Sequence, residues 1–173
     1  MPTTAPTSTE LAQFCARYLA AWNGGDATAM ADLVTDDVVW EDPALPGPAR
    51  GPAAVQEFMR EARVAFPDLH FDDSDEPHLT ADGDRVAWRW RMRGTNTGPM
   101  DPPGFAPTHR AIEIEGVDLW TMRDGRIARS RAFYDFNALA VQLGLAPAPG
   151  SRMEKGAVVL QRLQARVTRR RSA

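Results

Sequence analysis

Alternation of apolar and polar positions dominates the second half of the chain and predicts antiparallel β-strands. A period of two is typical of a strand with one buried face, and it recurs in three segments. These predicted strands cover residues 85–94, 112–122 and 127–134. A further short strand is expected around Leu69–Phe71, and the dipeptide Asp82-Gly83 predicts a hairpin turn.

The first half of the chain shows helical spacing instead. Apolar residues recur every three or four positions in 11–22 and in 52–66, which predicts two amphipathic helices with a shorter helix, 27–34, between them. A short strand at Val38–Trp40 precedes the loop that leads into the second long helix. Helices followed by antiparallel strands indicate an α+β fold, in which three N-terminal helices cover one face of a curved sheet.

The end of the chain differs from the rest in composition. A short helix at 136–143 is followed by a linker with proline and glycine and then by a predicted tail helix at 153–167. We therefore divide the chain into a domain, 1–147, and a basic linker and tail helix, 148–173. The whole chain has a net charge of −3, but its last 22 residues carry seven basic side chains against one acidic one. The tail is thus about +6 and the remainder about −9, and a solvated basic helix explains this better than a polyanion site.

Composition indicates an ordinary globular protein. Hydrophobic residues make up 43% and charged residues 25% of the 173 positions, which suits one domain with an apolar core. A single cysteine allows no internal disulfide, and the three histidines lack the spacing of a metal site. No apolar run is long enough to cross a membrane, and the first ten residues do not look like a signal peptide. We expect a cytoplasmic protein with neither a nucleic-acid nor a membrane partner.

One acidic residue breaks the alternation of the strand at 112–122. Asp118 falls on the apolar face of that strand, between Gly116 and Trp120. A buried charge without a partner costs several kcal/mol, so Asp118 must be solvated, paired or protonated. Three more polar residues occupy positions expected near the same apolar face: Tyr18, Asp42 and Asp135.

Each of these four residues also has a structural interpretation. Tyr18 fits a core tyrosine, Asp42 precedes a proline and fits a turn, and Asp135 fits the N-cap of the helix at 136–143. Asp118 has the weakest structural explanation, because an apolar strand face offers a carboxylate few partners. The four together predict proton-transfer chemistry in an apolar pocket.

The pocket is expected to hold a flat, apolar small molecule without the help of a cofactor or a metal. Neither a glycine-rich phosphate loop nor a metal-ligand pattern occurs in the sequence. The side chains predicted to bind the substrate are aromatic or lie near the pocket mouth: Trp40, Phe58, Trp88, Trp90, Met92, His109, Trp120 and Phe133.

The N-terminal half resembles the bacterial ketosteroid isomerases. The stretches "ARYLAAWNGGD" (16–26) and "VVWEDPALPGPARGPAAVQEF" (38–58) follow the pattern of that family. The resemblance implies that Tyr18 is an oxyanion-hole tyrosine and that Asp42 is the general base. It also implies that Asp118, in "GVDLWTM", is a protonated aspartic acid that donates the second hydrogen bond to the oxyanion.

The C-terminal half resembles the SnoaL-like polyketide cyclases. Residues 98–147 carry their inserted loop, followed by "DGRI", an acid-ended strand "RAFYDF" and "VQLG". The resemblance implies that Asp135 is a catalytic acid/base, although the cyclases have a histidine where Asp118 stands and lack the Tyr18 and Asp42 equivalents. Both families share the NTF2-like cone fold, and the two resemblances together cover about residues 10–147.

These features predict an enzyme that enolises a ketone of a polycyclic or polyketide-like molecule, leading to double-bond isomerisation or aldol-type ring closure. One alternative is a water-adding enzyme that uses Asp135, because the last strand also resembles that of limonene-epoxide hydrolase. That enzyme needs an Arg and an Asp where this chain has Trp90 and Met92. The other alternative is a binding protein without catalytic activity.

The family resemblance also implies a homodimer formed through the outer face of the sheet. This face carries the arginines of the strand at 85–94, which include Arg89 and Arg91. The same arginines are able to pair with Glu113 and Glu115 on the neighbouring strand instead.

Overall fold

The computed structural model describes residues 8–73, 77–80, 84–101 and 103–171. Within this part, five helices and seven strands are present, and all the strands belong to one sheet. The predicted turn at Asp82-Gly83 lies outside the described residues.

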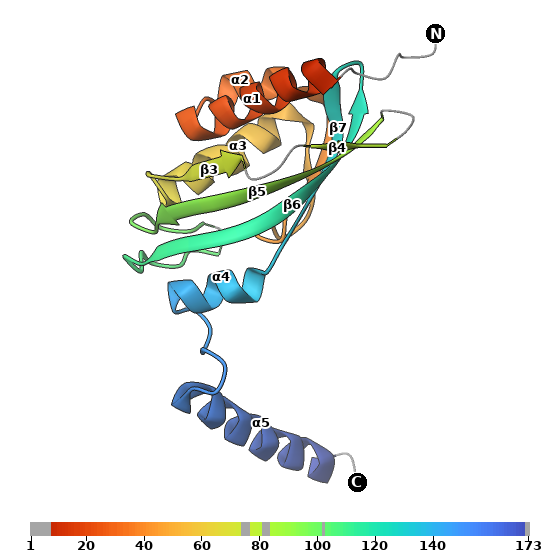
Figure 1. Cartoon of the computed structure of the whole chain (residues 1–173). Helices are drawn as coiled ribbons and strands as arrows, with labels where there is room; N and C mark the ends of the chain where they lie inside the picture. The colour runs from red at the N-terminus through yellow and green to blue at the C-terminus, as the bar shows by residue number, and fades with distance from the viewer. Residues whose placement is uncertain (1–7, 74–76, 81–83, 102, 172–173) are drawn as a thin grey trace.

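Three N-terminal helices lie on one face of the sheet, as predicted (Figure 1). They are α1 (Ser8–Gly24), α2 (Ala27–Asp32) and α3 (Gly51–Ala65). Because of their helical spacing, Leu11, Phe14 and Tyr18 lie on one side of α1. This side packs in the core, where each of them is at most 4% exposed. The side chain of Asp26 caps α2 by accepting hydrogen bonds from the backbone N–H groups of its first turn.

The sheet is curved and mostly antiparallel. In spatial order its strands are β2-β1-β7-β6-β5-β3, and β4 pairs with one end of β5. The strands are β1 (Val34–Glu41), β2 (Ala49–Arg50), β3 (His70–Asp73), β4 (His78–Leu79), β5 (Arg85–Thr95), β6 (Ala111–Arg123) and β7 (Arg126–Tyr134). Only β1 runs parallel to its neighbour β7 among the described pairs. The predicted α+β class is confirmed.

The strand at 38–40 is longer than the sequence indicated, and β2 was missed. β1 already begins at Val34, because that residue pairs with Ile127 of β7 before an irregularity in the register. The two residues of β2 pair with Val39 and Trp40. Both features depend on pairing with strands remote in sequence, and local periodicity does not report such pairing.

A glycine in the middle of β6 makes room for a tryptophan. Gly116 pairs with Trp90 of β5 on one side and with Tyr134 of β7 on the other. A Cβ atom added to Gly116 would lie 2.3 Å from Cζ2 of Trp90. The indole of Trp90 therefore occupies the space that any other residue at position 116 would fill.

Changing Gly116 to alanine is expected to lower the free energy of unfolding by about 2 kcal/mol, because Trp90 must leave its buried position. Urea denaturation measures this loss. Gly94→Ala, near the end of the neighbouring strand β5, is the control, since the nearest atoms to its added Cβ are 3.4 Å away. Equal losses in both variants would contradict the packing role of Gly116.

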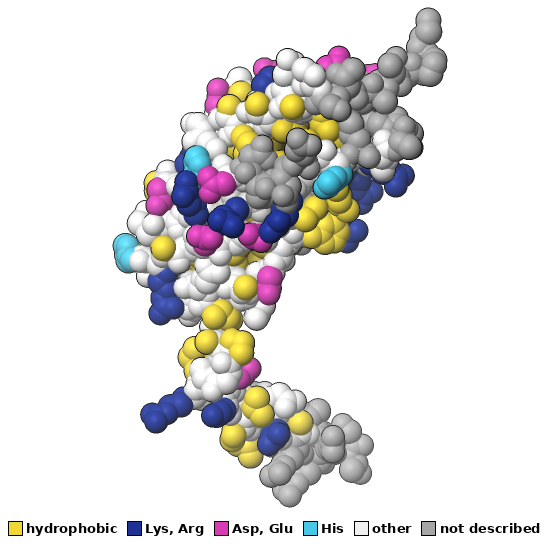
Figure 2. All heavy atoms as spheres, in the orientation of Figure 1, with side chains coloured by type: hydrophobic (Ala, Val, Ile, Leu, Met, Phe, Trp, Pro, Cys, Tyr) yellow, Lys and Arg dark blue, Asp and Glu magenta, His cyan; other side chains and the backbone are white. Residues whose placement is uncertain are grey.

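The outer face of β5 and β6 carries paired charges (Figure 2). Arg89 Nη2 lies 2.7 Å from Glu115 Oε2, and Arg91 Nη2 lies 3.1 Å from Glu115 Oε1. Arg91 Nε also lies 3.7 Å from Glu113 Oε1. Both arginines thus form ion pairs with glutamates of the adjacent strand. The sequence analysis gave this pairing as the alternative to a role of the arginines in dimer contacts. The pairs are half-exposed and add little to stability.

The last two helices follow the sheet. α4 (Phe136–Leu143) matches the predicted helix and ends at Gly144, whose φ of 75° is the left-handed conformation that glycine adopts easily. α5 (Arg152–Arg171) stands away from the sheet and from the other helices (Figure 1). Its apolar side chains Met153, Leu160 and Leu163 are each more than half exposed. No helix in the described ranges is long and apolar enough to cross a membrane.

A chain that ends at Pro147 is expected to unfold within about 2 °C of the full-length protein, because α5 packs on none of the core elements. Thermal unfolding followed by circular dichroism measures both temperatures. A chain that ends at Gln142 is the control, because it lacks Leu143, which is 3% exposed and belongs to the core. A large decrease for the chain ending at Pro147 would show that the tail stabilises the domain.

Candidate active site

A cavity of about 340 Å³ lies between the helices and the inner face of the sheet. Most of its walls are apolar and come from α1, α3, α4 and the middle of the sheet. The polar side chains among its lining residues are Tyr18, Asp42, Glu61, Asp101, Asp118 and Tyr134. An apolar cavity with a few converging polar groups is the usual form of a small-molecule site.

Asp118 is a buried carboxyl group with two hydrogen-bond donors. The Tyr18 hydroxyl donates to Oδ2 over 3.0 Å, and the indole N–H of Trp90 donates to Oδ1 over 2.9 Å. Burial raises the pKa of Asp118 to about 7, although the hydrogen bonds from Trp90 and Tyr18 act in the opposite direction and the charge of Asp42 adds to the rise. The acidic residue that breaks the strand pattern is therefore paired, and it titrates near neutral pH.

The strand register explains how Trp90 reaches this carboxyl group. Trp90 pairs with Gly116, two residues before Asp118 on the same face of β6. The missing side chain at Gly116 lets the indole lie along β6 toward Asp118. The absence of a side chain at Gly116 thus makes the hydrogen bond from Trp90 to Asp118 possible.

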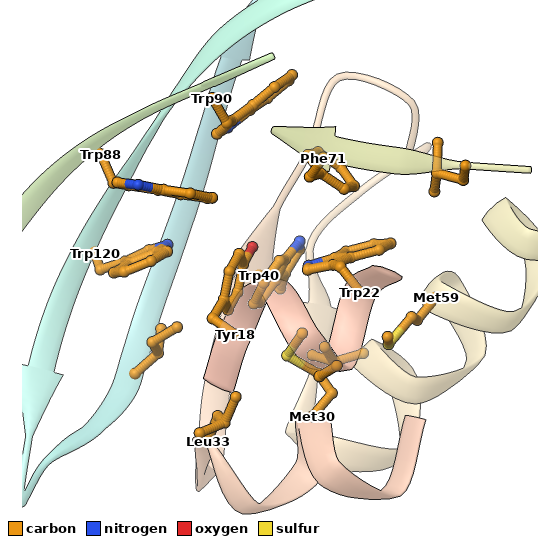
Figure 3. Packing of buried hydrophobic residues seen from close by; sticks show 14 of the residues in the cluster. Tyr18, Trp22, Met30, Leu33, Trp40, Met59, Phe71, Trp88, Trp90 and Trp120 are labelled. Atoms are coloured by element: carbon orange, nitrogen blue, oxygen red, sulfur yellow. The ribbon is translucent and has the colours of Figure 1, made fainter. Parts of the chain in front are cut away.

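Tyr18 enters the site from α1. Its ring contacts Trp88 and Trp120, with ring centroids 5.4 and 4.8 Å away, and it is stacked on Trp40 at 6.4 Å (Figure 3). Burial and the nearby charge of Asp118 hold the pKa of Tyr18 well above its ordinary value. Tyr18 therefore keeps its proton and acts as a hydrogen-bond donor at physiological pH.

Asp42 directly follows the last residue of β1 and also lines the cavity. Its Oδ1 accepts hydrogen bonds from the Tyr134 hydroxyl and from the backbone N–H of Ala44, each over 2.8 Å. Burial raises the pKa of Asp42, while these two hydrogen bonds favour the ionised form. Both recorded hydrogen bonds within the described part of the chain end on Oδ1, so Oδ2 is the oxygen available to take up a proton. Asp42 forms the predicted turn and lines the cavity as well.

The sequence pattern that defines the SnoaL-like polyketide cyclases matches residues 12–143, which carry all of these side chains. The chain belongs to this family. No curated protein matches the chain.

Solved structures show the same fold as this SnoaL-like protein. TsrD from Streptomyces laurentii has a TM-score of 0.70 and 23% identity, over 82% of this chain and 99% of TsrD. IdmH from Streptomyces antibioticus, provisionally assigned as a polyketide cyclase, has a TM-score of 0.63 and 27% identity over 77% and 97% of the two chains. A Catenulispora acidiphila protein with a ketosteroid isomerase-like fold has a TM-score of 0.63 and 17% identity over 76% and 92%. The NTF2-like cone and the resemblance to both groups are confirmed.

Four of the residues expected to bind substrate line the cavity of this family member: Trp40, Phe58, Trp90 and Met92. Trp88 and Trp120 do not, because they pack behind Tyr18 in the core and are at most 1% exposed. His109 is exposed in the loop before β6, away from the cavity lining. For these three residues, the predicted location at the pocket was wrong.

Phe133 and Asp135 also lie outside the cavity lining. Phe133 is 44% exposed and falls on the same side of β7 as Arg131, whose guanidinium lies over its ring. Asp135 is exposed and caps α4 by accepting a hydrogen bond from the Ala138 N–H over 2.8 Å. The structural interpretation of Asp135 as a helix cap is therefore correct. The cyclase resemblance implies a place for Asp135 in the site, but its side chain does not line the cavity.

Tyr134 is the site residue that the sequence analysis missed. Along β7, Ser130 and Ala132 are buried while Arg129 and Arg131 are exposed, and this alternation places Tyr134 on the inward side. Phe133 was selected for its hydrophobicity rather than for its position in that alternation. Among the described residues, no three His, Cys, Asp or Glu side chains are placed to hold a metal ion.

Proposed function

We propose that this SnoaL-like protein is a cofactor-independent enzyme that enolises a ketone of a polycyclic or polyketide-like molecule. One observation carries the proposal: two carboxyl groups with different environments line one apolar cavity. Among the described residues, the hydrogen bonds to Asp42 end on Oδ1, whereas both oxygens of Asp118 are held, by Tyr18 and Trp90. Pairs of acidic groups whose different surroundings give them different pKa values, one suited to a base and one to an acid, are typical of proton-transfer sites.

Asp42 is the proposed general base. Its Oδ2 removes a proton from the carbon next to the substrate carbonyl, and the electron pair of that C–H bond moves toward the carbonyl oxygen. The hydrogen bond from Tyr134 keeps the carboxylate oriented during this step. For isomerisation, the same Asp42 then returns the proton to another carbon of an unsaturated ketone, which moves the double bond. For ring closure, the enolate carbon attacks a second carbonyl carbon, the π electrons of that carbonyl move to its oxygen, and Asp42 gives its proton to the resulting alkoxide.

Tyr18 and Asp118 are the proposed donors to the developing enolate oxygen. With its pKa of about 7, Asp118 carries a proton in a large share of molecules at neutral pH. A protonated Asp118 has one O–H group to donate, and Tyr18 then no longer bonds to a charged carboxylate, so both hydroxyl hydrogens are able to turn to the substrate oxygen. Donors fixed in a dry cavity stabilise such a charge far better than water does.

The water-adding alternative relies on Asp135, which caps α4 on the surface. The binding-protein alternative predicts that ligands enter the cavity without exchanging protons. Deuterium uptake from heavy water into β-tetralone, an enolisable two-ring ketone, decides between enolisation and binding alone. We expect uptake at the carbon next to the carbonyl to be faster with the protein than without it, in proportion to the amount of β-tetralone bound.

A further inference from the structure

One tryptophan that lines the cavity carries a buried N–H group without an acceptor. The indole nitrogen of Trp40 has no hydrogen-bond partner in the described part of the chain, although the side chain is only 2% exposed. Trp40 belongs to the cavity lining. Buried polar groups are nearly always hydrogen-bonded, so donors of this kind in the wall of a cavity point to a ligand atom.

The orientation of Trp40 supports this interpretation. Its ring is stacked on Tyr18 with an angle of 18° between the planes. Figure 3 shows the Trp40 nitrogen and the Tyr18 oxygen at the same end of this stack, toward Trp90 and Phe71, which also line the cavity. The Tyr18 hydroxyl is already hydrogen-bonded to Asp118, whereas the indole hydrogen of Trp40 has no acceptor among the residues that the structure describes.

We propose that the indole N–H of Trp40 forms a second subsite that binds a different ligand oxygen from the one held at Tyr18 and Asp118. The inference rests on the proposed function for the position of that first oxygen. An indole is a donor only, so the subsite takes an acceptor such as a carbonyl or hydroxyl oxygen. A carboxylate ligand is disfavoured, because Asp42 and Asp118 line the same cavity. The preferred ligand is therefore a neutral ketone with at least one more oxygen.

The subsite is tested by binding ligands of one three-ring skeleton that differ in oxygen content. Anthracene has no oxygen, anthrone has one, and anthraquinone and dithranol, the dihydroxy form of anthrone, have more. Equilibrium dialysis gives a Kd for each ligand with the full-length protein. We expect Trp40→Phe to reduce the preference for at least one oxygen-rich ligand over anthrone by about tenfold, the usual effect of one lost hydrogen bond.

Controls separate the hydrogen bond from the loss of ring area. The smaller phenylalanine ring is expected to weaken the binding of all four ligands alike. The Kd of anthracene measures this loss of contact area, and the ratio of two Kd values cancels it. Replacement of Trp40 by its benzothiophene analogue keeps the ring size and removes only the donor, and it should give the same ratio as Trp40→Phe.

Ratios that stay within twofold of the wild type in both Trp40 variants would overturn the subsite and assign the donor to water. Binding is measured without turnover. A failed subsite therefore leaves the proton-exchange result for Asp42 standing, and a failed exchange result leaves the binding ratios interpretable.

Discussion

Deuterium uptake into bound β-tetralone is expected to fall by about 10³-fold when Asp42 is replaced by asparagine. The amide keeps the size of the side chain and still accepts hydrogen bonds from Tyr134 and Ala44 at its oxygen, but it takes up no proton. General-base catalysis contributes about 10²–10⁴-fold to such reactions, so this single substitution removes most of the effect. Mass spectrometry of the ketone after incubation in heavy water measures the rate, and equilibrium dialysis shows whether the ketone still binds.

Asp135→Asn is the matched control for this experiment. It makes the same chemical change in an exposed side chain that caps α4, and asparagine is an equally good cap. We expect unchanged uptake in this variant. The reverse result, with Asp135→Asn inactive and Asp42→Asn active, would favour the water-adding alternative and would show that the wrong carboxylate had been assigned.

Replacing Asp118 with asparagine is expected to stabilise the protein above pH 7 by up to about 4 kcal/mol. The pKa of Asp118 is about 7 in the folded protein against the usual 3.8, so unfolding releases a proton between these pH values. Rising pH therefore favours the unfolded state from about pH 4 to pH 7, and the loss is constant above that range. The three-unit difference in pKa corresponds to about 4 kcal/mol, and asparagine carries no such penalty.

Urea denaturation from pH 4 to pH 8 measures this effect as the difference between the variant and the wild type. The difference should be small at pH 4 and should grow until about pH 7. The asparagine oxygen is able to accept from Trp90, and its amide hydrogen is able to donate to Tyr18, so both buried contacts have a partner. Asp36→Asn is the control for the chemical change itself, because the side chain of Asp36 is 97% exposed. A difference that does not change with pH would mean that Asp118 ionises as an ordinary carboxyl group.

The predicted stability gain also bears on why the residue is acidic. A protein selected for stability alone would have an apolar or neutral side chain at this position of β6. An aspartate with a raised pKa destabilises the folded state, and such costs are characteristic of functional sites. The expected increase in stability of Asp118→Asn is thus the counterpart of the proton-donor role that we propose for Asp118.

Periodicity in the sequence determined most of the elements. The helices and the long strands follow from spacings of about 3.6 and 2, because one side of each element must face a common core. The same spacing identified Asp118 and Tyr18 as polar residues on apolar faces, and burial confirms both positions. The same alternation places Tyr134 on the inward side of β7, whereas the more hydrophobic Phe133 falls on the outer side.

Tertiary structure alone decided which side chains meet. Tyr18 and Asp118 are 100 residues apart in the chain, and Asp42 and Tyr134 are 92 apart, so no local pattern reports their hydrogen bonds. The role of Gly116 depends on the register between β5 and β6, since only the pairing with Trp90 shows what fills its missing side chain. Periodicity records which face of an element is buried, whereas the contacts across that face depend on how strands and helices distant in sequence pack together.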